Sequence, residues 1–270
     1  IISGCTDPDT KKVCWIHIEQ RTPKRAAASF RTYREAMDCY GRFDRIICVS
    51  NTVRQDFHNL LPVKVPTEVL YNTNESAKIM ALSGEAVEDG LFSDKEIKLV
   101  GVGKLLKNKG FHRMLPVVQK LRRDGYPVHL YILGIGPMEE EMKQAAAELG
   151  ISDAVTLLGY QTNPYKYVAK CDLFVCASHA EGFSTAATEA LIVGTPVCTV
   201  EVSGMKEMLG SHNEYGIVTE NDEDALCQGI KKLLDNPELL EHYRHQAALR
   251  GKDFRTEETV KAVEAMLMEL

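Results

Sequence analysis

The chain has 270 residues, of which 44% are hydrophobic and 26% are charged, and its formal net charge is −6 at pH 7. These fractions are typical of globular proteins, and the length suits one large domain or two of moderate size. Residues 1–72 are net basic, whereas the rest of the chain is net acidic, which argues against a nucleic-acid-binding protein. The longest apolar runs, such as residues 128–135, are well below the ~20 residues that a membrane span needs. We therefore expect a soluble, cytoplasmic protein.

Eight cysteines are spread along the chain without any Cys-x-x-Cys pair, and several lie in apolar runs that resemble strands. Cysteines in such positions are typical of small buried hydrophobic residues in a reducing compartment. We expect neither disulfides nor cysteine metal ligands.

The first part of the chain is expected to hold three strands and two helices. The strands are predicted at 13–18, 45–49 and 67–71, and the helices at 25–40 and 50–60, the latter capped by Ser50 or Asn51. Residues 72–96 are polar and weakly patterned, which predicts a domain boundary. A Rossmann-like domain is built from two βαβαβ halves. Because only three strands precede the boundary, we expect the front half of an N-terminal domain to be missing from this chain.

Strand and helix patterns alternate regularly from residue 97 onward. Strands are predicted at 97–102, 128–133, 155–158, 173–176, 196–200 and 215–218, and helices at 111–123 (interrupted at Pro116), 138–149, 163–169, near Met205 and over most of 222–270. Apolar strands that alternate with helices predict an α/β fold with a doubly wound parallel sheet. We expect a partial Rossmann-like domain with its linker at 1–90, a complete one at 91–255, and a C-terminal helix at 256–270 that packs back toward the first.

Two glycine-containing loops follow strands of the second domain and begin helices. In the loop 102–110, Gly103 lets a ligand approach the backbone, and Lys104 and Lys109 bring two cations to one turn. Ammonium groups and helix N–H groups can hold a diphosphate there, although the spacing is not that of a Walker A loop, and loop lysines are often simply solvated. Residues 133–137, Leu-Gly-Ile-Gly-Pro, either join this site or form an ordinary tight turn.

A third loop supplies two acids, Glu181 and Glu189, on either side of a Gly-Phe-Ser-Thr turn that begins a helix. In an open α/β sheet, ligands bind beyond the carboxyl ends of strands and against helix N-termini. Carboxylates accept hydrogen bonds from vicinal hydroxyls, so both acids suit a sugar or a ribose. The alternative for Glu189 is an ordinary surface glutamate, which its Ala, Leu and Ile neighbours disfavour.

These loops together read Gly-Lys-Leu-x-x-x-Lys-Gly, Gly-x-Gly-Pro, and Glu-Gly-Phe-Ser with a second Glu after seven residues, followed by Gly-Thr-Pro-Val. This pattern resembles the retaining glycosyltransferases of family 4, strongly over residues 98–250 and more weakly over 13–72. The resemblance implies the type-B fold, in which two Rossmann-like domains face each other across a cleft. It also implies transfer of a sugar from a nucleotide-diphosphate donor with retention of configuration.

The resemblance also implies roles for individual residues. The catalytic residues would be His17 and Glu181, and the donor-binding residues would be Gly103, Lys104, Lys109, Gly136, Tyr160, Gly182, Phe183, Ser184, Thr185 and Glu189. The two lysines would bind the diphosphate, Glu189 the ribose and Glu181 the donor sugar, while Tyr160 would border the base. Backbone N–H groups from Phe183 to Thr185 would meet sugar hydroxyls and phosphate. His17, otherwise a strand-end histidine, would reach the reaction centre from the N-terminal domain.

Three positions depart from the family pattern and leave the sugar and the base open. Lys104 stands where arginine is common, so a bidentate clamp is replaced by a point charge. Ser184 stands where glycine is usual, and Ile135 where a small or polar residue is common. UDP-sugars are expected ahead of GDP- and ADP-sugars, with a carbohydrate or lipid-linked acceptor, in polysaccharide or glycoconjugate synthesis. The alternatives are a non-catalytic nucleotide-sugar-binding fragment and another type-B enzyme, a phosphorylase or an epimerase.

No metal or other cofactor is expected, because two lysines and a helix N-terminus can stabilise a departing diphosphate. Two Asp-x-Asp sequences, at residues 7–9 and 222–224, match a metal motif only superficially. The first lies in an irregular segment, and the second is typical of a helix start.

The segment from Arg21 to Arg45 holds seven basic residues against three acidic ones. Such a segment could attract anionic lipid or a lipid-linked pyrophosphate acceptor, at about 1 kcal/mol per basic residue near a charged surface. The first case would add peripheral contact with the inner face of the membrane. A solvated helix face is an equally good interpretation.

Overall fold

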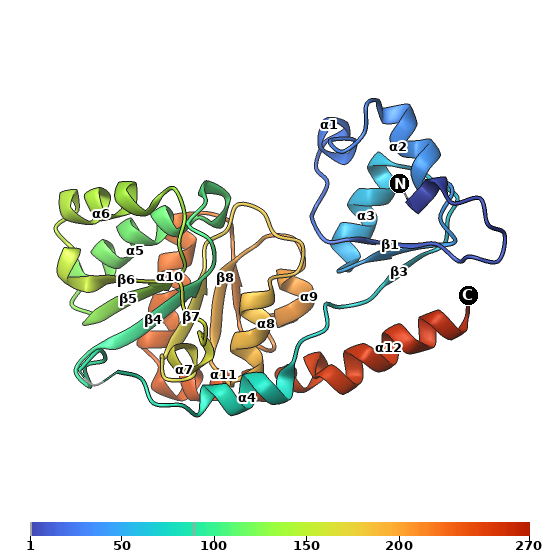
Figure 1. The fold of residues 1–270 in the computed structure, drawn as a ribbon. Coiled ribbons are helices and arrows are strands. Elements are labelled where there is room, and N and C mark those ends of the chain that lie inside the picture. The colour runs from blue at the N-terminus through green and yellow to red at the C-terminus, as the bar shows by residue number, and fades with distance from the viewer. Residues whose placement is uncertain (1, 89) are drawn as a thin grey trace.

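Two parallel β-sheets form the framework of the protein, whose computed structural model describes residues 2–88 and 90–270 (Figure 1). The smaller sheet has three strands in the order β1-β2-β3, and the larger has six in the order β6-β5-β4-β7-β8-β9. We call the parts built on them the small unit (residues 2–72) and the large unit (residues 97–254). The predicted α/β class with parallel sheets is confirmed.

The small unit folds as short helices packed on its sheet. Its elements are the 3₁₀ turn η1 (Ile2–Gly4), strands β1 (Val13–Ile16), β2 (Arg45–Cys48) and β3 (Thr67–Val69), and helices α1 (Pro23–Ala26), α2 (Tyr33–Tyr40) and α3 (Asn51–Leu60). The single helix predicted over residues 25–40 is wrong. The side chains of Thr22 and Thr32 each accept a hydrogen bond from the backbone N–H three residues on, so each begins a separate helix. Ser50 caps α3, as predicted.

The large unit holds the six-stranded sheet and most of the helices. Its strands are β4 (Ile97–Val102), β5 (Val128–Leu133), β6 (Val155–Gly159), β7 (Leu173–Cys176), β8 (Val197–Val200) and β9 (Ile217–Thr219). Its helices are α5 (Phe111–Arg123), α6 (Glu139–Glu148), α7 (Tyr165–Val168), α8 (Thr185–Ile192), α9 (Met205–Leu209), α10 (Glu223–Leu234) and α11 (Pro237–Arg250), with 3₁₀ turns η2 (Lys107–Lys109), η3 (Ser152–Ala154) and η4 (Gly251–Phe254). Within the described ranges, no helix combines the length and the apolar character that a membrane span requires.

The strand order of the large sheet reverses between β4 and β7, which pair with each other although about 70 residues separate them. This is the arrangement of a doubly wound sheet, in which loops on either side of the reversal diverge and leave a crevice beyond the carboxyl ends of the strands. Helices α5, α6 and α10 form one contacting group, while α8 contacts both α7 and α11. The reversal therefore determines where a ligand site can form.

Helix α5 runs without interruption through Pro116, so the predicted break there is wrong. A proline inside a helix removes one backbone hydrogen bond and crowds the preceding turn. Here Met114, Leu115, Val117 and Val118 are all buried around the proline. Burial of these side chains against the sheet offsets the lost hydrogen bond.

The boundary segment predicted at 72–96 contains a helix, α4 (Ser76–Ser83), that the sequence pattern did not indicate. The residue before it, Glu75, makes no side-chain cap. Instead, the Ser76 N–H donates to the side-chain oxygen of Thr256 at 3.0 Å, and α4 packs against α7 and α8. Tertiary contacts that are distant in sequence stabilise this helix, which is why local propensity missed it.

Helix α12 (Thr256–Met268) leaves the large unit and runs beneath the small sheet (Figure 1). Met266 of this helix packs in a buried cluster with Ile47 and Leu70, and Trp15 lies at the edge of the cluster. Arg45 adds an ion pair with Glu269 at 3.2 Å. Part of the small unit's core therefore comes from the end of the chain.

Replacing Met266 by alanine should lower the free energy of unfolding by about 2–4 kcal/mol, because the side chain is 1% exposed and its removal leaves a cavity. Met268, which is 87% exposed on the same helix, provides a matched control whose change to alanine should be nearly neutral. Trp15 is the chain's one tryptophan, so its fluorescence during urea unfolding reports on this cluster directly. Equal destabilisation by the two substitutions would contradict the packing described here.

Candidate functional site

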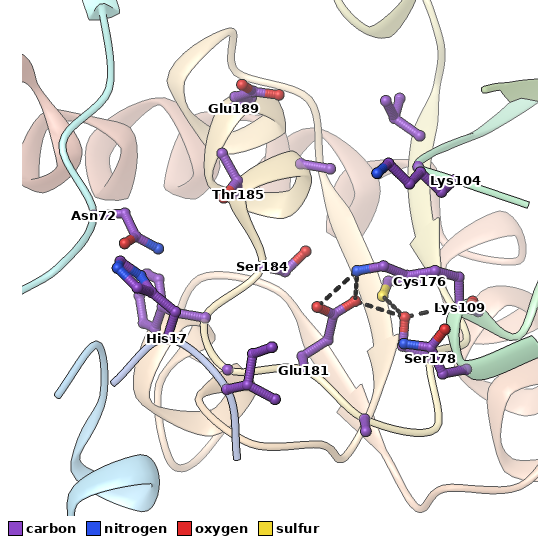
Figure 2. A pocket seen from close by; sticks show the side chains of 18 of the residues that line it. His17, Asn72, Lys104, Lys109, Cys176, Ser178, Glu181, Ser184, Thr185 and Glu189 are labelled. Carbon is purple, nitrogen blue, oxygen red and sulfur yellow. Dashed lines mark hydrogen bonds and ion pairs between the residues drawn. The ribbon is translucent and has the colours of Figure 1, made fainter. Parts of the chain in front are cut away.

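A cavity of 640 Å³ opens at the carboxyl edge of the large sheet, next to β4 and β7 (Figure 2). The loops that follow these two strands line most of it, together with the first turn of α8. The small unit contributes His17, Ile18, Arg25 and its last residue, Asn72, which follows β3. The cavity thus lies at the strand-order reversal and is shared by both units.

Of the twelve site residues predicted from the sequence, ten line this cavity. They are His17, Gly103, Lys104, Lys109, Glu181, Gly182, Phe183, Ser184, Thr185 and Glu189. Gly136 and Tyr160 are the exceptions. A Cβ atom on Gly136 would lie 2.5 Å from the carbonyl oxygen of Leu105, so this glycine serves the packing of two neighbouring loops. Tyr160 is 71% exposed and lies outside the cavity lining.

An ion pair between Lys109 and Glu181 lies in the cavity (Figure 2). The Lys109 ammonium donates to both carboxylate oxygens, at 2.8 and 2.9 Å. The hydroxyl of Ser178 donates to Glu181 Oε1 at 2.7 Å, and the thiol of Cys176 donates to Ser178 Oγ at 3.4 Å. Glu181 is only 9% exposed in its side chain, so these donors compensate the burial of its charge. They also fix the direction in which the carboxylate points.

Further donors come from Lys104 and from the start of α8. Among the described residues, no carboxylate oxygen lies within 4.0 Å of the Lys104 ammonium. Ser184 caps α8 by accepting a hydrogen bond from the backbone N–H of Ala187. The N–H groups of Thr185 and Ala186 belong to the first turn, where an α-helix has no internal acceptors, and both residues line the cavity. The cavity therefore presents a cation and two helix N–H groups that suit an anion.

Glu189 lies one turn further along α8, on the same side as Thr185 (Figure 2). Burial raises the pKa of its carboxyl to about 7, and the hydroxyl of Tyr165, which donates to Oε1 at 3.3 Å, opposes this only in part. Near neutral pH the group therefore changes between a hydrogen-bonding acid and an acceptor-only carboxylate.

The small unit meets the large one directly at the site. A Cβ atom on Gly182 would lie 1.9 Å from the carbonyl oxygen of His17, so only glycine allows the two backbones to approach this closely. Next to this contact, Phe183 stacks on Tyr71 with ring centroids 4.7 Å apart, and both rings pack edge-on against Phe254. The loop that carries Glu181 is consequently held by the small unit as well as by its own sheet.

Several lining residues were not among the predicted site residues, and three of them with polar side chains are Ser178, Asn72 and Arg25. Ser178 precedes Glu181 by three residues after a strand, a local spacing that could have suggested the hydrogen bond. Asn72 ends the third strand segment, and Arg25 lies in the segment read as a basic surface. Neither carries a local signal, because both reach the cavity from the other side of the interface.

Replacing Glu189 by glutamine should stabilise the protein at pH 8 by about 2–3 kcal/mol and have little effect at pH 5. The folded-state pKa lies above the usual 4.5, so the full stability is present below pH 4.5 and is lost as the pH rises to about 7. Urea unfolding at both pH values measures the difference. Glu264→Gln, a change of the same kind at an exposed position of α12, is the control, and a gain that did not depend on pH would contradict the buried carboxyl.

Residues 84–250 match the family model described as Glycosyl transferases group 1. A Campylobacter jejuni enzyme, N-acetylgalactosamine-N,N'-diacetylbacillosaminyl-diphospho-undecaprenol 4-alpha-N-acetylgalactosaminyltransferase, is 36% identical over 189 residues, which cover 69% of this chain and 49% of that protein. The lipopolysaccharide core biosynthesis glycosyltransferase LpsD of Rhizobium meliloti is 28% identical over 172 residues, or 64% of this chain and 48% of LpsD. The chain thus spans about half the length of the curated relatives it matches.

Solved structures of similar fold extend over both units. HepE from Anabaena, in complex with UDP-glucose, aligns with 96% of this chain and 72% of its own, with a TM-score of 0.80 and 20% identity. TarM from S. aureus aligns with 97% of this chain and 51% of its own, with a TM-score of 0.78 and 17% identity. These likenesses establish the fold as that of the type-B glycosyltransferases. Because the family model covers more than half of its length, the chain belongs to the group 1 glycosyl transferases.

Proposed function

We propose that this chain carries the donor site of a retaining, metal-independent glycosyltransferase that moves a sugar from a UDP-sugar to a lipid-linked or carbohydrate acceptor. One observation carries the proposal. A single cavity at the strand-order reversal brings together two lysines, the start of α8 and two carboxylates. Those groups match the three parts of a nucleotide sugar, namely a diphosphate flanked by a ribose and a sugar.

The diphosphate would bind Lys104, Lys109 and the first N–H groups of α8. Cations and helix N-termini both favour phosphate oxygens, and the two effects add where they face the same group. As the bond between sugar and phosphate breaks, negative charge grows on the leaving diphosphate. Donors already in position stabilise this charge without a metal ion.

The two carboxylates would hold the ends of the donor. Glu189 would accept hydrogen bonds from the ribose hydroxyls, which favours the ionised form of a group whose pKa is about 7. Glu181 would accept from hydroxyls of the donor sugar, in the direction set by Ser178 and Lys109. The Lys109–Glu181 pair thereby joins the diphosphate end of the site to the sugar end.

Retention of configuration is proposed from the resemblance of the loop motifs to the retaining glycosyltransferases of family 4. We propose no covalent intermediate, because both carboxylates that line the cavity among the described residues are assigned to holding the donor. These carboxylates are Glu181 and Glu189, and Glu181 is held by Lys109 and Ser178. A short-lived oxocarbenium-like ion pair fits this setting, with the acceptor attacking on the face from which the diphosphate leaves. His17 would face that reaction centre from the small unit.

The comparisons support the donor and the acceptor classes. HepE is solved with UDP-glucose, and TarM is solved with UDP. The Campylobacter relative is named for an acceptor that carries a sugar on diphospho-undecaprenol. We extend both features to this chain as part of the proposal.

Calorimetric titration with UDP, GDP and ADP tests the donor site. UDP should bind with a dissociation constant below 1 mM and more tightly than GDP and ADP. Failure of all three nucleotides to bind below millimolar concentration would refute the proposed function, and tighter binding of GDP or ADP would refute only the choice of base.

Replacing Lys109 by methionine should weaken UDP binding about ten- to a hundredfold, because a charge-assisted hydrogen bond contributes about 1.5–3 kcal/mol. Uridine, which lacks phosphate, should bind the variant and the original chain equally. Lys107→Met removes the same charge two residues away, outside the cavity lining, and should change UDP affinity little. Equal losses for UDP and uridine would contradict the diphosphate role of Lys109.

A further inference from the structure

A second cavity, of 680 Å³, lies on the small unit and is lined entirely by residues between Thr22 and Tyr33. This segment comprises α1, the start of α2 and the connection between them. Lys24, Arg25 and Arg31 line the cavity, and no acidic residue does. We call it the basic cavity.

Within residues 2–88 and 90–270, the three cations of the basic cavity have no acidic partner. Among the described residues, no carboxylate lies within 4.0 Å of the charged groups of Lys24, Arg25 or Arg31. Arg21 and Arg45, which flank this segment, do form ion pairs, with Glu19 and Glu68 respectively. The acid nearest in sequence to Arg31, Glu35, accepts the backbone N–H of Arg31 at 2.7 Å and makes no ion pair with its guanidinium. Three like charges around one hollow favour an anion, and guanidinium groups suit phosphate oxygens.

Apolar side chains form most of the remaining lining, next to the hydroxyls of Thr22 and Thr32. Phe30 and Tyr33 line the basic cavity together with Pro23 and two alanines. The ring of Phe30 packs edge-on against Tyr40, with centroids 5.4 Å apart, and the Tyr33 hydroxyl donates to the carbonyl of Leu60. This lining suits a ligand that carries an apolar group next to its anion.

Arg25 lines both the basic cavity and the cavity shared by the two units. In Figure 1, α1 lies on the side of the small unit that faces the large unit. A ligand whose anion rests in the basic cavity can therefore extend past Arg25 toward His17. This is the direction from which an acceptor would approach the donor sugar.

We propose that the basic cavity binds the diphosphate of a lipid-linked acceptor. Lys24, Arg25 and Arg31 hold the phosphate oxygens, and the apolar walls receive the first carbons of the lipid. The acceptor's sugar then reaches the donor across Arg25. This inference rests on the proposed function and adds to it the place on the small unit where the acceptor's diphosphate binds and the residues that hold it.

Farnesyl diphosphate, an isoprenoid diphosphate, is a suitable probe. Calorimetric titration of the 270-residue chain in the presence of saturating UDP keeps the probe out of the donor site. The chain should bind farnesyl diphosphate under these conditions, more tightly than it binds inorganic pyrophosphate. The double variant Lys24→Gln/Arg31→Gln, which leaves Arg25 and the donor cavity intact, should bind it about thirtyfold more weakly, at about 1 kcal/mol for each basic residue.

Two further double variants distinguish a specific binding site from nonspecific electrostatic attraction. Arg34→Gln/Arg42→Gln removes two exposed cations of the same segment that do not line the basic cavity, and it should weaken the probe less than threefold. Lys24→Arg/Arg31→Lys keeps both charges and should retain binding to within about fivefold. UDP affinity should be the same in all these variants, which also shows that they fold.

Several results would overturn the inference. They are loss of farnesyl diphosphate binding when UDP is added, equal losses in the two Gln double variants, and no preference for farnesyl diphosphate over pyrophosphate. Binding to phosphatidylglycerol vesicles without binding to farnesyl diphosphate would assign the segment to a membrane surface instead. If the chain binds UDP but not farnesyl diphosphate, this inference alone fails, whereas failure to bind UDP, GDP or ADP removes the proposed function itself.

Discussion

The close approach of Gly182 to the carbonyl of His17 is the constraint on which the site depends. A side chain at residue 182 would force the two backbones apart, since its first carbon would fall 1.9 Å from the His17 oxygen. The contact presses the loop between β7 and α8 against the small unit. Phe183 then stacks on Tyr71, and the Ser50 hydroxyl lies within hydrogen-bonding distance of the Gly182 carbonyl. This loop thus determines both the shape of the cavity and the position of the small unit relative to the large one.

The loop between β7 and α8 also carries a buried carboxylate, which would destabilise the fold if it had no partners. A carboxylate as buried as Glu181 needs compensation, and it receives this from Lys109 and Ser178. Glu189 on α8 has no ion pair with the part of the chain that the structure describes, and burial raises its pKa to about 7 instead. Two acids eight residues apart therefore have different electrostatic properties, although the sequence presents them as a pair. This difference suits one acid to a site beside a cation and the other to neutral hydroxyls.

The large unit could be predicted from the sequence because its strands are continuous apolar runs and its turns carry glycine and proline. The small unit was predicted less well. Local patterns merged α1 and α2, whose separation depends on the cap at Thr32, and missed α4, which is stabilised by a contact with Thr256. In the candidate site, too, residues with a local sequence signal were predicted better than residues that depend on distant contacts. Most predicted loop residues of the large sheet line the cavity, although Ser178 was missed, whereas Asn72 and Arg25 were missed because they reach the cavity across the interface.

The uneven charge of the chain acquires a structural meaning in this arrangement. The acidic excess lies in residues 73–270, outside the small unit. The small unit contributes Lys24, Arg25 and Arg31, which form no ion pair with the residues that the structure describes. Arg25 borders both cavities, and Lys104 and Lys109 lie across the shared one. Cations therefore line the path from the basic cavity to the lysine loop, with Glu181 between them. A donor and an acceptor that each carry a diphosphate would be held apart by separate cations and would meet at the sugar, beside the single carboxylate fixed by Ser178.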